Sequence, residues 1–222
     1  MNKWLVTIFA VALVQVTYAQ SVNDLANELR VIIGSKQANI SINIGLQSKL
    51  ITQTRQALRD TTSKAISNLR GQLIGLNDVA KTAITNASQQ SKSIEQCIAD
   101  EQAALSPLNI DDIRNCANSD ILTLAGSLLG QLGAVQGDLG SAVRNCIQLS
   151  PLDLTEIRSC VDNALVDVDD SVNTINNEIQ SLVNAALEST EECTKAEETQ
   201  LNGVISDIEE NLNKCVDAIL NA

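Results

Sequence analysis

Apolar residues recur at alternating spacings of four and three along much of the chain, and this pattern predicts long amphipathic helices. One stripe lies at Val161, Leu165, Val168, Val172, Ile175, Ile179, Leu182 and Ala186. The final segment repeats the spacing at Leu201, Ile205, Ile208, Leu212, Cys215 and Ile219. Such stripes are typical of the contact faces of coiled-coil-like helices.

An earlier stripe has smaller side chains, which favours close helix packing. It comprises Ala65, Leu69, Leu73, Leu76, Ala80, Ala83 and Ala87. Polar and glycine residues interrupt the pattern between positions 31 and 45, and the alternation of a strand is sustained nowhere. The expected fold class is therefore all-α, an elongated antiparallel helical bundle of about four to six coiled-coil-like helices, stapled by disulfides.

The first nineteen residues predict a signal peptide that is cleaved before Gln20. Lys3 supplies the positive charge, an apolar stretch runs from Trp4 to Val14, and Thr17 to Ala19 form the cleavage pattern. The apolar run is shorter than the roughly 20 residues that span a bilayer. We therefore expect a secreted, extracellular protein whose mature chain has no integral membrane segment.

Charge divides the mature chain into a cysteine-free, net basic region at 20–96 and an acidic region at 97–222. Residues 20–97 carry nine basic and five acidic side chains. The formal net charge of the whole chain is −12, and it becomes −13 once Lys3 is removed. This negative charge argues against nucleic acid and anionic membranes as partners, because binding to phosphate groups needs a concentrated basic face. The two regions attract each other, within one molecule or between molecules, and together predict one continuous domain.

All six cysteines lie in the acidic region or at its edge, and an even count behind a signal peptide predicts three disulfides. A helical segment of 30 residues separates Cys116 from Cys146 by about 45 Å, whereas a disulfide needs Cα atoms within about 7 Å. The same argument excludes Cys160 with Cys193. Sequential pairing remains the favoured scheme. The expected pairs are Cys97–Cys116, Cys146–Cys160 and Cys193–Cys215, with Gly203 as the only obvious turn in the last segment.

An internal repeat supports that pairing. Residues 105–116 match residues 149–160, and the chain's only prolines, Pro107 and Pro151, occupy the same place in both copies. Each copy predicts a loop followed by a helix whose second turn is tied to the preceding helix. The helix is capped either by Ser106 and Ser150 with proline next, or by Asn109 and Asp153 with Asp112 and Glu156 three residues later.

Five glycines lie on one face of the predicted helix at 121–140. They are Gly126, Gly130, Gly133, Gly137 and Gly140. Because each costs about 1 kcal/mol relative to alanine in a helix, some compensation is expected. Three interpretations remain open: close approach of a neighbouring helix, a membrane-associating segment, or a hinge.

The mature chain lacks Trp, Tyr, Phe, His and Met, which removes the imidazole of most catalytic triads and the rings that stack on ligands. Three aspartates, Asp167, Asp169 and Asp170, lack the pattern of an EF-hand. Glu191, Glu192, Glu197 and Glu198 would form an acid–base site only if buried. With no histidine and no close cysteine pair, we expect no metal, no cofactor and no catalytic residue.

Two sequons, at Asn39 and Asn86, are predicted N-glycosylation sites in a secreted glycoprotein. Both lie in the cysteine-free region. A glycan at either position requires an exposed helix edge or loop.

The spaced cysteines and the repeated Ile-Arg-x-Cys elements at 113–116 and 157–160 resemble secreted insect proteins that carry the TsetseEP domain. The resemblance covers most of the mature chain. It implies an all-helical secreted protein and carries no catalytic residues. The Glu-Pro repeat tail of the family's namesake is missing, which puts a midgut or parasite-related role in doubt.

These features favour a secreted, non-enzymatic protein with a structural or interaction role in an extracellular, gut or gland secretion. Its expected partner is a second copy of itself or another secreted protein. The alternative is a carrier of lipid or another apolar ligand, held by amphipathic helices.

Overall fold

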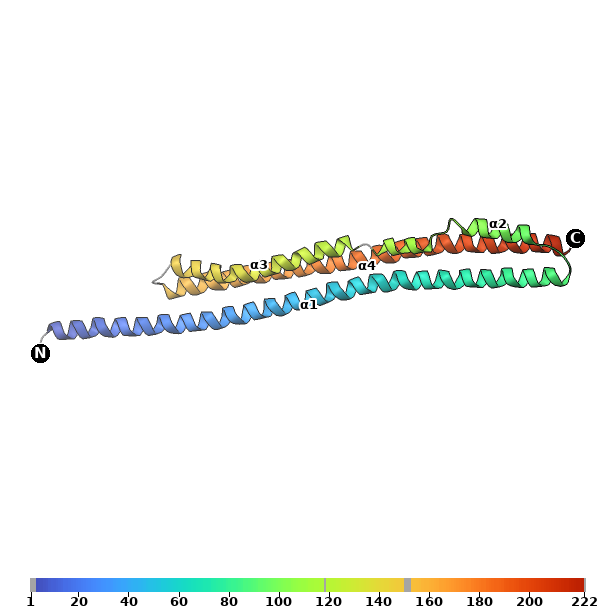
Figure 1. Ribbon diagram of the computed structural model, residues 1–222. Helices are drawn as coiled ribbons and strands as arrows, with labels where there is room; N and C mark the ends of the chain where they lie inside the picture. The colour runs from blue at the N-terminus through green and yellow to red at the C-terminus, as the bar shows by residue number, and fades with distance from the viewer. Residues whose placement is uncertain (1–2, 118, 150–152, 222) are drawn as a thin grey trace. The chain divides into compact units, whose positions relative to one another are not determined.

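The computed structural model describes residues 3–117, 119–149 and 153–221, with side chains from Val22 onward except Leu149. Four α-helices and one 3₁₀ helix follow one another, and no strand occurs in these residues (Figure 1). They are α1 (Lys3–Gln89), α2 (Glu95–Leu105), the 3₁₀ helix η1 (Ile110–Cys116), α3 (Asp120–Leu149) and α4 (Leu154–Leu220). The all-α fold class is confirmed. The side chains of the predicted signal peptide lie outside the described part.

The chain forms two compact units, and each combines parts of the basic and the acidic region. Unit 1 consists of Met1–Ile51 and Leu124–Ser181, and unit 2 consists of Thr52–Thr123 and Leu182–Ala222. Helices α1 and α4 therefore contribute to both units, whereas α2 and η1 belong to unit 2 alone.

The core of unit 1 is built from the apolar stripes of three helices. Its buried residues are Leu29 from α1, Leu139, Val143 and Cys146 from α3, and Ile157 and Val161 from α4. Leu165 and Val168 pack against this cluster. The face of α4 that begins at Val161 is thus buried as the spacing predicts.

The core of unit 2 joins α1, α2, η1 and the C-terminal part of α4, and Figure 1 shows α2 beside that part of α4. Leu69 and Ile113 are completely buried. The remaining core residues include Ala65, Leu76, Ala80, Ala83 and Ala87 of α1, and Leu201, Ile205, Ile208 and Leu212 of α4. Both predicted stripes are therefore confirmed as core faces.

Contacts between α1 and α4 show that these helices run in the same direction. In unit 1, Glu28 pairs with Arg158 and Lys36 pairs with Asp169, so residue numbers rise together. In unit 2, Asn68 donates to Glu198, and further along α1 the loop residue Lys92 contacts the end of α4. The antiparallel expectation does not hold for this pair. It holds for α3 and α4, which meet as a hairpin at Cys146–Cys160.

Four of the five glycines on this face of α3 have no neighbour among the described residues. A Cβ atom placed on Gly126, Gly130, Gly133 or Gly137 meets no atom within 4 Å. Only Gly140 has one, the amide of Gln37 at 3.9 Å. Close approach of a neighbouring helix is therefore the wrong interpretation for these glycines. In the described residues, no helix has the length and apolarity needed to cross a membrane.

This open face gives a direct test. Replacing Gly130 and Gly133 with alanine adds methyl groups to open space and removes the entropy cost of glycine in a helix. We expect the double variant Gly130→Ala/Gly133→Ala to raise the free energy of unfolding by about 2 kcal/mol, since each glycine costs about 1 kcal/mol. Urea denaturation followed by circular dichroism measures the change. A loss of stability would mean that another surface covers this face.

Candidate functional site

The three disulfides connect α4 to three different elements. Their Cα separations are 5.7 Å for Cys97–Cys215, 5.5 Å for Cys116–Cys193 and 5.7 Å for Cys146–Cys160. The structure therefore pairs Cys146 with Cys160 as the loop between them predicts. The other two expected pairs, Cys97–Cys116 and Cys193–Cys215, are wrong.

The error comes from the length of α4. Gly203 does not turn the chain, so Cys193 and Cys215 lie 22 residues apart on one continuous helix. That spacing corresponds to about 33 Å, far beyond the reach of a disulfide. Helix α2 and η1 instead run back along α4, which brings Cys97 to Cys215 and Cys116 to Cys193. Near the second bond, the Thr190 hydroxyl also donates to the carbonyl of Cys116 at 3.0 Å.

The two copies of the repeat form different elements. Asn109 accepts a hydrogen bond from the backbone N–H of Asp111 and begins η1, whereas Asp153 accepts from the N–H groups of Thr155 and Glu156 and begins α4. Asn109 and Asp153 are thus the caps. Ser150 and Pro151 lie outside the described residues. Only the second copy is disulfide-bonded to the helix before it, through Cys160 and Cys146 of α3. Cys116 of the first copy bonds instead to Cys193 of α4.

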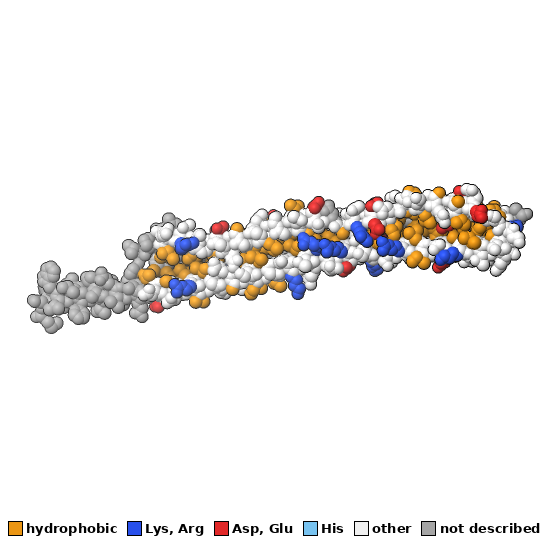
Figure 2. All heavy atoms as spheres, in the orientation of Figure 1, with side chains coloured by type: hydrophobic (Ala, Val, Ile, Leu, Met, Phe, Trp, Pro, Cys, Tyr) orange, Lys and Arg blue, Asp and Glu red, His pale blue; other side chains and the backbone are white. Residues whose placement is uncertain are grey.

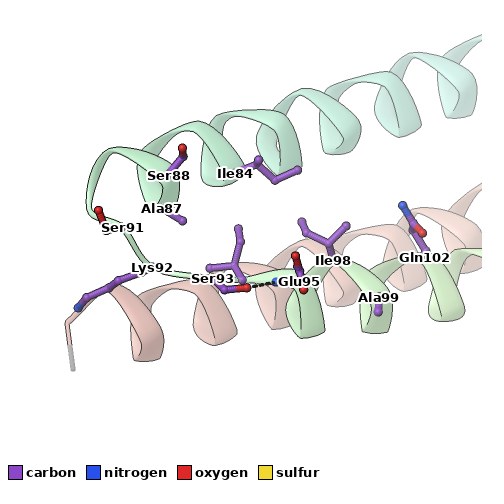
Figure 3. Close-up of a pocket in the computed structure, with 11 residues that line it drawn as sticks. Ile84, Ala87, Ser88, Ser91, Lys92, Ser93, Glu95, Ile98, Ala99 and Gln102 are labelled. Atoms are coloured by element: carbon purple, nitrogen blue, oxygen red, sulfur yellow. Dashed lines mark hydrogen bonds between the residues drawn. The ribbon is translucent and has the colours of Figure 1, made fainter.

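A cavity of about 520 Å³ lies in unit 2 between the end of α1 and the start of α2 (Figure 3). Its apolar lining consists of Ile84, Ala87, Ile94, Ile98 and Ala99. Its polar lining consists of Ser88, Ser91, Lys92, Ser93, Glu95 and Gln102. We call this cavity the α1–α2 pocket, and its size is within the range of small-molecule sites.

The turn at the end of α1 shapes one side of this pocket. The N–H of Lys92 donates to the carbonyl of Ala87 at 2.9 Å, and the N–H of Ser91 donates to the carbonyl of Ser88 at 3.1 Å. Ser91 has a φ of 55°, a left-handed conformation that usually belongs to glycine at the end of a helix. This closure turns the chain into the short segment that leads to α2.

Lys92 connects the same turn to α4 through hydrogen bonds. Its ammonium group donates to the carbonyls of Ile219 and Leu220 at 3.0 and 2.8 Å. These carbonyls are among the last of α4, which lack partners within the helix and attract a cation. Figure 3 shows the Lys92 side chain directed away from the gap between Ile84 and Ile98, which face each other across the pocket.

A second cavity of unit 2, about 540 Å³ in volume, lies between α1 and α4. Glu191 and Glu198 line it together with Lys64 and Lys195. Glu198 also accepts a hydrogen bond from Asn68 at 3.2 Å. The structure thus brings two of the four predicted glutamates to one groove, whereas Glu192 and Glu197 do not line it. Because lysines accompany the carboxylates, the groove is a mixed-charge surface.

The three aspartates lie on α4 in unit 1 and are exposed. Asp169 forms an ion pair with Lys36, and the backbone carbonyl of Asp167 accepts from Ser171. In the residues that the structure describes, no cluster of acidic or cysteine side chains is placed to hold a metal ion. The trio is therefore part of a solvated helix face.

Both sequons lie on α1, where Asn39 and Asn86 are exposed. The hydroxyl of Ser41, the third residue of the first sequon, accepts a hydrogen bond from Gln136 at 2.6 Å. The exposure that a glycan needs is present at both asparagines, and glycosylation stays a prediction.

Sequence reasoning missed a buried carboxyl group at Glu101. This residue is 7 % exposed and lines a cavity of about 200 Å³ beside the Cys97–Cys215 disulfide. Burial raises the pKa of Glu101. Its position four residues after Cys97 is the signal available in the sequence, because that spacing puts both side chains on one face of α2.

No family model matches this chain, and no curated protein or solved structure matches it either. The resemblance to TsetseEP-domain proteins stays a prediction.

The disulfide pairing can be tested by removing whole bonds. In the chain-entropy model, loss of Cys97–Cys215, at a sequence separation of 118, costs up to about 5 kcal/mol, and loss of Cys146–Cys160, at a separation of 14, costs about 3 kcal/mol. Unfolding free energies of Cys97→Ala/Cys215→Ala and Cys146→Ala/Cys160→Ala measure the two costs. A free thiol in either double variant would contradict the assigned pairs.

Glu101 gives a pH-dependent prediction. Because its folded-state pKa is raised, the ionised carboxylate destabilises the folded protein, and this loss grows as pH rises through the unfolded and then the folded pKa. We expect Glu101→Gln to raise the free energy of unfolding at pH 7 more than at pH 3.5. The exposed neighbour Asp100→Asn is the control. Equal effects of Glu101→Gln at the two pH values would contradict the burial argument.

Proposed function

We propose that this protein is a secreted, non-enzymatic interaction protein that associates with further copies of itself in an extracellular, gut or gland secretion. The observation that carries the proposal is an apolar face of α1 in unit 1. Val31, Ile42 and Leu46 are 71, 62 and 62 % exposed. Figure 2 shows hydrophobic side chains reaching the surface between Lys and Arg residues.

These three side chains share one side of the helix. Spacings of 11 and 4 residues correspond to about three turns and about one turn of an α-helix. Single exposed apolar residues are ordinary, but a row of them on one helix face marks a surface that benefits from burial. A helix-to-helix contact is the simplest way to bury such a row.

Charge complementarity supports a second copy as the occupant. Arg30 and Lys49 are exposed on α1 in the same unit, and Asp162, Asp167 and Asp170 are exposed on α4. The basic surface of one molecule therefore fits the acidic surface of another, despite the net negative charge. Opposite charges steer such an encounter and fix its orientation.

We further propose that α1 and α4 pack as a coiled-coil-like pair within unit 1. One heptad after the Lys36–Asp169 ion pair, the same register places Asn43 opposite Asn176. The side-chain oxygens of both asparagines are buried and lack a hydrogen-bond partner in the described part of the chain. Buried asparagines in coiled coils fix the register at a cost in stability, and we assign that role to this pair.

Secretion is supported by the disulfides, which persist in oxidising compartments. The predicted signal peptide and the exposed sequon asparagines agree with the same route. Glycosylation at Asn86, membership of a TsetseEP-like family and an insect source are part of the proposal. Asn39 lies seven residues before Leu46 on the same side of α1, so a glycan there would block self-association.

The alternative function is a carrier of an apolar ligand. The α1–α2 pocket favours it, because five apolar residues line a cavity that is large enough for a small molecule. Native mass spectrometry of the secreted protein compares the two functions: a ligand that leaves on denaturation supports the carrier, and a ligand-free oligomer supports self-association.

If the apolar face of α1 forms the contact between copies, charged side chains placed on it should weaken self-association. In the variant Ile42→Glu/Leu46→Glu, two carboxylates replace the apolar contact. We expect the dissociation constant of the oligomer to rise at least about ten-fold, because roughly 1.4 kcal/mol is lost when two large apolar groups stay in water. Sedimentation velocity at low salt measures the change.

Leu124→Glu is the matched control, because Leu124 is 58 % exposed on α3 of the same unit and belongs neither to the apolar face of α1 nor to the acidic surface of α4. It should change the dissociation constant much less. A monomeric native protein at all accessible concentrations would overturn the proposal.

A further inference from the structure

We propose that the α1–α2 pocket binds a small neutral aliphatic molecule that carries a hydroxyl group, such as a medium-chain alcohol. This inference rests on the carrier alternative and assigns it a site and a ligand class. The site lies wholly within unit 2, at residues 84–102.

The apolar part of the pocket selects an aliphatic ligand. Ile84 of α1 and Ile98 of α2 face each other across the gap (Figure 3), and the buried residues Ala87 and Ile94, together with Ala99, complete the apolar lining. These side chains are branched or small, and the mature chain has no aromatic ring for stacking. Ile84 is 47 % exposed, so a ligand that covers it removes apolar surface from water.

The polar part of the pocket selects a neutral head group. Ser88, Ser91 and Gln102 supply hydroxyl and amide groups that both donate and accept hydrogen bonds. The nearby cation does not offer a site for an anion, because the Lys92 ammonium already binds the last carbonyls of α4. Glu95 and the net negative charge further disfavour an anionic ligand such as a fatty acid.

The walls of the pocket are fixed before a ligand arrives. Cys97, next to the pocket residues of α2, is bonded to Cys215 of α4, and Lys92 ties the α1 turn to the same end of α4. Ala87 and Ile94 belong to the core of unit 2. A preformed pocket spares the ligand the cost of ordering the chain.

The test uses the full mature chain, labelled with ¹⁵N and titrated with 1-octanol. Because backbone amides report binding residue by residue, we expect saturable chemical-shift changes at residues 84–102. Octanoate should bind at least about five-fold more weakly, since its charge meets Glu95 without a free cation. Octanoate binding as tight as that of octanol would overturn the neutral class.

Two isoleucines on α1 provide a matched pair of variants. Ile84→Lys places a charge in the pocket and should raise the dissociation constant of octanol about ten-fold or more, because an ammonium group resists burial with an alkyl chain. Ile74→Lys changes an isoleucine that is 63 % exposed and outside the pocket, and should alter the constant less than about two-fold. Equal effects of the two variants would overturn the site.

The outcomes also separate this inference from the functions it builds on. Saturable octanol shifts outside residues 84–102 overturn the pocket and leave the carrier function standing. An absence of shifts at millimolar octanol overturns the pocket as well, and the native mass spectrum then decides the carrier function independently. Because both isoleucine positions are exposed, unchanged amide dispersion in the rest of each spectrum verifies that the variants fold.

Discussion

Each disulfide attaches a different element to α4, so this 67-residue helix is the covalent support of the fold. Cys97 attaches α2, Cys116 attaches η1 and Cys146 attaches α3. A core without aromatic rings buries less area for each side chain than one with them. The crosslinks offset this weakness by restricting the unfolded chain. Helix α1 has no cysteine and depends on apolar burial and on polar contacts such as Lys92 with the end of α4.

Local periodicity predicted which faces are buried but could not predict where the chain reverses. Leu69, Val161 and Ile205 lie in the cores as expected because a buried face repeats every three or four residues. The sequence predicts a turn at Gly203, yet α4 continues through this residue, since one glycine costs only about 1 kcal/mol in a helix. Two matching sequences likewise form a 3₁₀ helix in one place and the start of α4 in the other, and their cysteines bond to different partners.

The α1–α2 pocket depends on tertiary structure that no sequence motif predicts. Ile84 and Ile98 face each other only because Ser91 adopts a left-handed conformation and lets α2 return beside α1. Serine at that position carries no signal, whereas glycine would have suggested the turn. The four glutamates between positions 191 and 198 do not form one cluster, because a helix places successive residues about 100° apart. Glu191 and Glu198 line the groove between α1 and α4, whereas Glu192 and Glu197 do not.

The distribution of cysteines also determines how the molecule responds to a protease. A cut between α2 and η1 leaves both new ends covalently joined, because Cys97 and Cys116 are each bonded to α4. A cut in the short segment between α1 and α2 has the opposite result, since every residue before Cys97 is then held only by non-covalent contacts. After a single cleavage near Lys92, α1 would therefore stay attached by packing alone, and denaturation would separate it as an amphipathic peptide from the crosslinked remainder.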